Sequence, residues 1–261
     1  MAYDRTLIQI RERSFLDLLD LAIVVLRRNA LPVGLAAAVG ILPFALLNVW
    51  LLLSDTEFPF YAYLALLMLE IPWATAPMTV VLGGLMFGEQ PGPKQVFLTL
   101  LRGLPAMILY QGIIRALLMI TVVLYPIVPT RMAFMDEVIL LERGKVRSAL
   151  KRCSSLSADR GADYFGQWLA QLLFSVLFIA CFWIGTGTIV DTLFAREVAW
   201  DDFFQVELAG FRLQFAIWIC VMFFGVARFL TYIDQRIRLE GWEIKLRLQS
   251  VGQSLEEASR W

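Results

Sequence analysis

The sequence predicts an all-α polytopic membrane protein, with about six transmembrane helices and amphipathic in-plane helices on the cytoplasmic side. Of its 261 residues, 59% are hydrophobic and 18% are charged, whereas soluble domains are about a quarter charged. The mean hydropathy is +0.68. Residues 31–53 contain no charge over 23 positions, and about 20 apolar residues suffice to span a bilayer.

The first expected element is an interfacial helix at 15–28. Ser14 and Asp17 have the spacing of a capping box, and Arg27 and Arg28 fall in the last turn, where the helix dipole favours cations. The segment is too short and too charged to cross the membrane. We therefore predict that it lies flat at the membrane surface.

The spans follow the apolar runs of a single integral membrane domain, 1–261. We predict them at about 31–53, 60–88, 104–125, 130–143, 164–189 and 208–230. The stretch 89–103 reads as a Pro/Gly turn and a short amphipathic piece, and 190–207 as an outer interfacial helix. A cytoplasmic amphipathic tail occupies 231–261, where Gly241 is a candidate helix break and the alternation after it is compatible with a strand.

The topology rests on the positive-inside rule, which places loops rich in Lys and Arg in the cytoplasm. The N-terminal region, the 89–103 loop and the 143–160 segment carry five, two and six such residues. All three fall on one side only if the chain crosses once more between Pro126 and Arg143. We therefore predict a short fourth span at 130–143, enclosed by other helices. The alternative is a five-span chain in which 104–125 is re-entrant.

Four charged residues are expected within the membrane. These are Glu70, Arg115, Asp136 and Glu137. Because a lone central charge costs about 2.5–3.5 kcal/mol on insertion scales, we expect either pairing, with Arg115 bound to one acid of the fourth span, or protonation of an acid. The cluster is either an internal ion pair that fixes the short span, or a polar path for a proton, an ion or a lipid headgroup.

A basic cytoplasmic surface is expected just after the fourth span. It consists of Arg143, Lys145, Arg147, Lys151 and Arg152. Such a run serves as a positive-inside anchor, or it binds anionic lipid or an acidic partner.

The sequence gives no sign of catalysis. It has no histidine, the commonest general base and metal ligand. GxSxG, Walker, HExxH and GxGxxG motifs are absent, and the three cysteines are widely spaced. We therefore expect no enzyme activity, no cofactor, no metal site and no nucleic-acid partner.

Three blocks of the chain resemble a bacterial membrane-protein family, in particular its stand-alone, planctomycete-type members. They are SFLDLLDLAIVVLRRNALPVGLAAAVGILPF (14–44), PTRMAFMDEVILLERGKVRSALKRCSSLS (129–157) and RFLTYIDQRIRLEGWEIKLRL (228–248). The family takes its name from the membrane domain of glycerophosphoryl diester phosphodiesterase. The resemblance implies an N-terminal in-plane helix, about six spans and a place in the bacterial inner membrane. The catalytic barrel of that enzyme is a separate domain that uses His, so the name implies no activity here.

Two functions are expected from these observations. The first is a non-enzymatic structural or assembly subunit of the inner membrane, with both termini in the cytoplasm. It would present an amphipathic platform to lipids, to partner proteins or to further copies of itself. The second is a transporter or lipid-handling protein that works through the charged cluster. A water- or lipid-filled cavity reaching the cluster favours the second function, and a dry, paired cluster favours the first.

Overall fold

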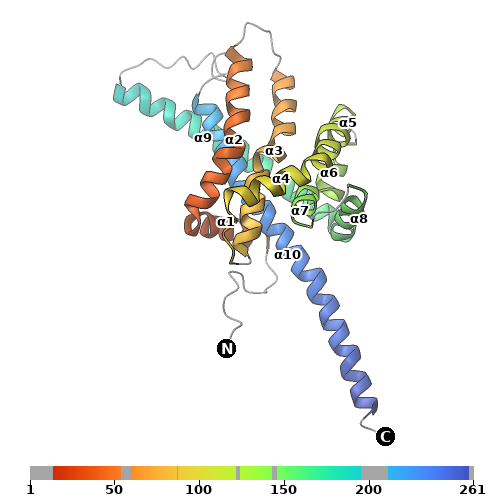
Figure 1. Cartoon of the computed structure of the whole chain (residues 1–261). Helices are drawn as coiled ribbons and strands as arrows, with labels where there is room; N and C mark the ends of the chain where they lie inside the picture. The colour runs from red at the N-terminus through yellow and green to blue at the C-terminus, as the bar shows by residue number, and fades with distance from the viewer. Residues whose placement is uncertain are drawn as a thin grey trace.

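The computed structural model describes residues 14–53, 60–86, 88–121, 124–142, 146–194 and 211–258. Every regular element in these ranges is helical (Figure 1): α1 Phe15–Arg28, α2 Ala30–Leu53, α3 Phe60–Met86, α4 Pro93–Met107, the π-helix η1 Ile108–Ile114, α5 Arg115–Ile120, α6 Ile127–Arg131, α7 Met135–Leu141, α8 Val146–Leu156, α9 Gly161–Phe194 and α10 Phe211–Ala258.

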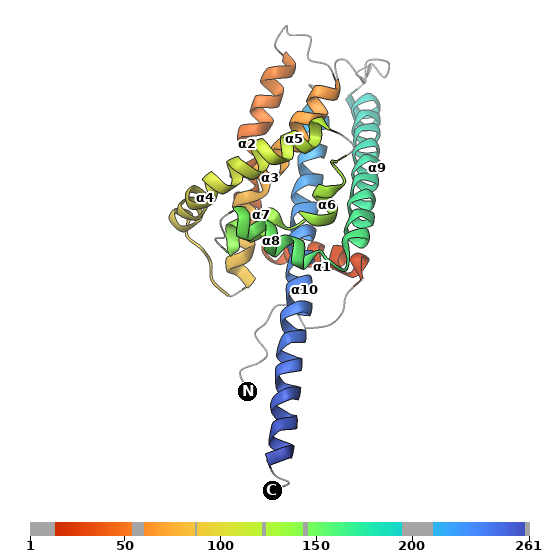
Figure 2. The same cartoon turned by 90° about the vertical axis from the view of Figure 1, so that its right-hand side faces the viewer.

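Five stretches of the described chain are long and apolar enough to cross a membrane. They are Ala30–Leu51, Tyr61–Met86, Pro93–Ile120, Gly161–Val190 and Leu213–Leu239. The all-α polytopic prediction is therefore confirmed, with five continuous candidate spans where the sequence predicted about six. Figure 2 shows α1, α8 and the C-terminal half of α10 at the same end of the bundle. Arg27 and Arg28 of α1 and Arg147, Lys151 and Arg152 of α8 therefore belong to helices at one end of the bundle.

The first helix forms as its local signals predict. The Ser14 side chain accepts a hydrogen bond from the Asp17 backbone N–H at 3.2 Å, and the Asp17 carboxylate accepts one from the Ser14 N–H at 3.0 Å. These two bonds satisfy orphan donors at the helix start. The helix buries Leu18 and Ala22 against the bundle and leaves Leu16 and Ile23 exposed. This division between its two faces suits a helix at a membrane surface.

Glycines let the central helices approach one another closely. A Cβ at Gly40 of α2 would lie 2.0 Å from the backbone oxygen of Ala74 in α3. A Cβ at Gly225 of α10 would lie 2.5 Å from the Met78 side chain of α3. Small residues at such crossings are the usual means of packing helices in lipid, where the hydrophobic effect does not drive association. They place α3 at the centre, between α2 and α10.

The third span begins earlier than predicted. Helix α4 starts at Pro93, directly after the predicted Pro/Gly turn, so residues 93–103 begin the long helical stretch and are not a separate piece. Pro105 lies inside α4, and the π-helix η1 follows it directly. A proline removes a backbone donor, and a π-turn is one way for a helix to accommodate such a disruption. The π-turn is important below because it carries Tyr110 and Gln111.

A continuous span at 130–143 is not present. The helix α6 ends at Arg131, and α7 begins only at Met135. Phe134, which precedes α7, packs its ring against Tyr164 and Tyr232 at centroid distances of 5.0 and 5.9 Å. Figure 2 shows α5, α6 and α8 at successively lower levels of the bundle, so the chain returns through short helical steps. The prediction that other helices enclose this segment agrees with the burial of Met135 through Leu140.

The last helix is longer than the predicted span at 208–230. Helix α10 continues through Gly241 to Ala258, so neither the predicted break nor a following strand occurs. One glycine in a helix costs only about 1 kcal/mol, and an i,i+4 ion pair of Asp234 and Arg238 forms at 2.7 Å. The predicted interfacial helix at 190–207 falls mostly outside the described residues, since α9 is described to Phe194.

Candidate functional site

Two buried carboxylates of α7 bind one arginine of α10. The Nε of Arg228 lies 2.8 Å from Glu137 Oε1, and its Nη2 lies 3.3 Å from Asp136 Oδ2. The side chain of Glu137 is fully buried, that of Asp136 is 5% exposed and that of Arg228 is 23% exposed. Adjacent helical residues point about 100° apart, but the planar guanidinium fork carries donors that reach both. The predicted pairing of an acid directly with Arg115 is therefore wrong.

Arg115 joins this network through an intermediate residue. Its Nη1 donates to Gln111 Oε1 at 3.0 Å, and the Gln111 amide donates in turn to Asp136. The π-helix directs Gln111 and Tyr110 toward α7, and both are about 1% exposed. Arg115 Nε is buried and makes no hydrogen bond. Within the part of the chain that the structure describes, Arg115 hydrogen-bonds to the neutral side chain of Gln111 and forms no ion pair with a carboxylate.

Glu70 does not belong to this cluster. Its Oε2 accepts a hydrogen bond from Asn48 Nδ2 at 2.7 Å, which links α3 to α2. The four charged residues that were predicted to form a single group therefore belong to two separate sites. One site contains Arg115, Asp136, Glu137 and Arg228, and the other contains Glu70.

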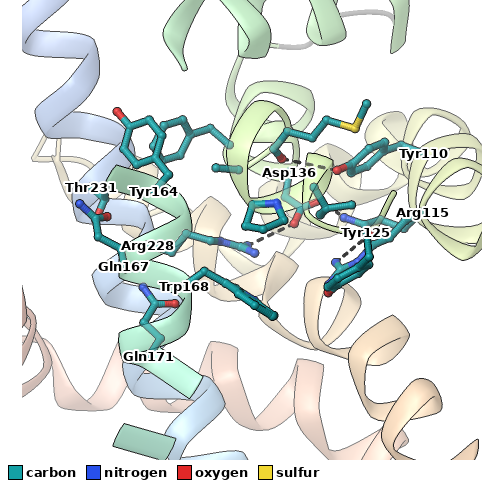
Figure 3. A pocket seen from close by; sticks show the side chains of 16 residues that line it. Tyr110, Arg115, Tyr125, Asp136, Tyr164, Gln167, Trp168, Gln171, Arg228 and Thr231 are labelled. Atoms are coloured by element: carbon teal, nitrogen blue, oxygen red, sulfur yellow. Dashed lines mark hydrogen bonds and ion pairs between the residues drawn. The ribbon is translucent and has the colours of Figure 1, made fainter. Parts of the chain in front are cut away.

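A partly open cavity of about 100 Å³ reaches the first site. Figure 3 shows Arg115 and Asp136 on one side of it, and the α9 residues Gln167, Trp168 and Gln171 on the other, with Arg228 extending toward Asp136. A water molecule occupies about 30 Å³ of liquid, so the cavity accommodates several waters or one small polar group. We call it the Arg115 cavity.

Two arginines, Arg115 and Arg228, and one carboxylate, Asp136, line the cavity. Arg228 is bound to both carboxylates, whereas Arg115 presents its charge beside the amides and phenols that complete the wall. Guanidinium groups bind carboxylates and phosphates with paired, charge-assisted hydrogen bonds. The geometry therefore suits a small anionic group placed against Arg115.

The comparisons with known proteins add nothing to this geometry. No family model matches the chain, and neither a curated protein nor a solved structure does. The resemblance to the glycerophosphodiesterase membrane-domain family stays a prediction.

The predicted basic surface is only partly described. Arg143 and Lys145 lie outside the described residues, whereas Arg147 and Lys151 are exposed on α8. Arg152 pairs with Glu142 at 3.3 Å. The opposite face of α8 buries Ala149, Cys153 and Leu156.

Cys153 lies on the buried face of α8. It is completely buried in the largest core cluster. Burial raises the pKa of its thiol to about 12, and only the thiolate is a nucleophile. Its role is packing, which is the reading that its isolated position in the sequence favoured.

Sequence analysis missed Gln111, Arg228, Asn48 and Gln214 as site residues. Each is a polar side chain within a long apolar helix. A polar residue in such a run is the sequence feature that could have identified them. Gln111 also precedes Arg115 by four residues, a spacing that brings two side chains together on one helix face.

Proposed function

We propose that this protein is a non-enzymatic membrane protein that binds the phosphate of a lipid headgroup in the Arg115 cavity. The observation that supports this most directly is a cation beside a polar cavity, with a buried Nε that has no hydrogen-bond partner. A phosphate oxygen there would accept a charge-assisted hydrogen bond, which contributes about 1.5–3 kcal/mol.

The surroundings favour a lipid over a free anion. The helices that form the cavity have apolar outer faces: Leu117 and Ile120 of α5 are 59% and 78% exposed, and Leu173 of α9 is 58% exposed. In a bilayer these faces contact acyl chains. A lipid could place its headgroup in the cavity while its chains stay outside, because about 100 Å³ does not enclose a whole lipid.

The network of ion pairs and hydrogen bonds around Arg228 and Asp136 gives the cavity a fixed shape. Arg228 joins α10 to α7, and the chain from Arg115 through Gln111 to Asp136 joins the third span to α7. Such preorganised donors lose little conformational entropy when a ligand binds. The network therefore serves both as the structural ion pair and as one wall of a binding site, the two roles that the sequence left open.

The test is thermal unfolding of the purified protein in detergent with three added probes. They are a short-chain phosphatidylglycerol, a diacylglycerol with the same acyl chains, and inorganic phosphate. We expect the phosphatidylglycerol to raise the melting temperature and the diacylglycerol to leave it unchanged. Arg115→Gln should weaken the lipid effect about tenfold or more, the equivalent of 1.4 kcal/mol or above.

Arg102→Gln is the matched control. Arg102 lies on the same helical stretch, is exposed and does not line the cavity. Stabilisation by inorganic phosphate alone, lost in Arg115→Gln, would assign the site to a soluble anion. Equal lipid effects in the wild type and in Arg115→Gln would overturn the proposal.

A second function, an assembly platform, is supported by a separate observation. The amphipathic helices α1 and α8 lie at the end of the bundle from which the C-terminal half of α10 extends (Figure 2). We propose that this end faces the cytoplasm, because the basic segments gather there. Crosslinking in cells that produce either the full-length protein or a variant without residues 240–261 would test it. An unchanged set of crosslinked products would exclude a contact through the tail.

A further inference from the structure

A second buried polar site lies between α2, α3 and α10, apart from the Arg115 cavity. It contains Asn48, Glu70, Tyr63 and Gln214, which are between 0% and 3% exposed. Asn48 and Glu70 form one hydrogen-bonded pair, and the Gln214 amide donates to the Tyr63 hydroxyl to form the other. Glu70 is close enough to Tyr63 to act on it electrostatically. Both pairs lie toward the ends of helices opposite to α1 and α8.

The site has more oxygen acceptors than donors. Three buried oxygens have no hydrogen-bond partner among the residues that the structure describes: Asn48 Oδ1, Glu70 Oε1 and Gln214 Oε1. One neighbouring donor, the Trp218 indole N–H, also lacks a partner. An unsatisfied buried acceptor is unfavourable, so native proteins fill such sites with a partner, a water or an ion. A single indole donor cannot satisfy three oxygens.

The charge of the site is also unbalanced. Glu70 brings one carboxylate, and its hydrogen-bond partner among the described residues is the neutral amide of Asn48. No cation acts on Glu70 among the residues that the structure describes; Arg115 is held by Gln111, and Arg228 by the α7 acids. The titratable neighbour is Tyr63, from the same helix. A buried carboxylate with a neutral hydrogen-bond partner, in a site that also holds unsatisfied amide oxygens, is complementary to one small positive charge.

We propose that the Glu70 site binds one small monovalent cation, a sodium ion or a proton, within the membrane. Carboxylate and amide oxygens are the ligands of hard cations, and a proton neutralises the same carboxylate. Intramembrane acids of this kind mark ion and proton pathways. This inference does not rest on the proposed lipid function, because the two sites share no residue.

The experiment measures the melting temperature of the detergent-solubilised protein in sodium chloride and in choline chloride at equal ionic strength. Ligand binding to the native state stabilises it by mass action. A ligand at ten times its dissociation constant should raise the melting temperature of a chain of this length by about 3 °C. A sodium site predicts a higher melting temperature in sodium chloride. A proton site predicts a rise from pH 8 to pH 6 in choline chloride.

Three variants make the result specific. Glu70→Gln removes the charge and keeps an amide for Asn48, so the sodium or proton dependence should disappear. Gln214→Met should reduce a sodium dependence while leaving the carboxylate in place. Asp163→Asn is the control, because Asp163 is an exposed carboxylate, 56% accessible, paired with Arg160 on the surface.

Each arm has a defined outcome. A sodium dependence lost in Glu70→Gln assigns the site to sodium, and a proton dependence lost in the same variant assigns it to a proton. If the wild type and Glu70→Gln respond identically to both cations, the proposal is overturned. If Glu70→Gln does not fold, a wild-type dependence that Gln214→Met lowers and Asp163→Asn retains supports it, and a wild type that responds to neither cation overturns it.

Discussion

Replacement of Arg228 by methionine should destabilise the protein more than the loss of any surface ion pair. The change leaves the fully buried Glu137 carboxylate without its cation, while Asp136 keeps only the amide of Gln111. Removal of one partner from a buried ion pair costs about 3–5 kcal/mol. For a chain of this size, each kcal/mol lowers the melting temperature by about 2–4 °C, so we expect a loss of roughly 10 °C.

The assay is thermal unfolding in detergent, followed by intrinsic tryptophan fluorescence, with size-exclusion chromatography to monitor folded yield. Arg160→Met is the matched control. Its pair with Asp163 is 3.0 Å long, but the side chains are 36% and 56% exposed, so the cost should be under about 1 kcal/mol. The double variant Arg228→Met with Glu137→Gln should recover part of the loss, because no fully buried charge then remains unpaired. Equal melting temperatures for Arg228→Met and Arg160→Met would refute the reasoning.

Three further predictions concern packing and hydrogen bonding. Gly40→Ala should lower the melting temperature by several degrees because its Cβ meets the α3 backbone, whereas Gly34→Ala, with open space around it, should be neutral or slightly stabilising; similar results for the two would contradict the close crossing of α2 and α3. Tyr232→Phe removes a 2.9 Å hydrogen bond to Glu142 and should cost about 1–2 kcal/mol in a denaturation experiment, while no loss would mean that the bond contributes nothing net. Cys153 should resist maleimide in the folded protein and react after denaturation, as measured by peptide mass spectrometry, and rapid native labelling would show that the core around α8 opens.

Local signals predicted the elements that depend on local interactions. The capping box of Ser14 and Asp17 fixes the start of α1, and its observed bounds equal those predicted from sequence. The long apolar runs gave α2, α3 and α9 to within a few residues. These features follow from the need to satisfy backbone groups at helix ends and from the cost of placing unpaired backbone groups and charges in lipid. Both effects depend on residues that are close together in the sequence.

The segment 130–143 shows where that reasoning fails. A tract of this length is compatible with a short span or with a buried core helix, and hydropathy does not separate the two. The actual path depends on the packing of Phe134 between Tyr164 and Tyr232, which come from α9 and α10. Such contacts join residues that are distant in sequence, so no local pattern reveals them.

The composition of the site was only partly predictable. The acids at 136 and 137 were identified because charge is rare in apolar tracts, but two arginines were available as partners. The actual partner, Arg228, lies 91 residues from Glu137 along the chain. Its pairing depends on the crossing of α10 past α7, and the Arg115 cavity depends on the way that α9 faces both. Neither follows from sequence spacing.

The most direct test of the central claim is an experimental structure of the protein in lipid nanodiscs that contain phosphatidylglycerol. The account predicts phosphate density within hydrogen-bonding distance of Arg115, with the acyl chains running along the outer faces of α5 and α9. A cavity that holds only water, with the Arg115 guanidinium paired to a protein carboxylate, would contradict it.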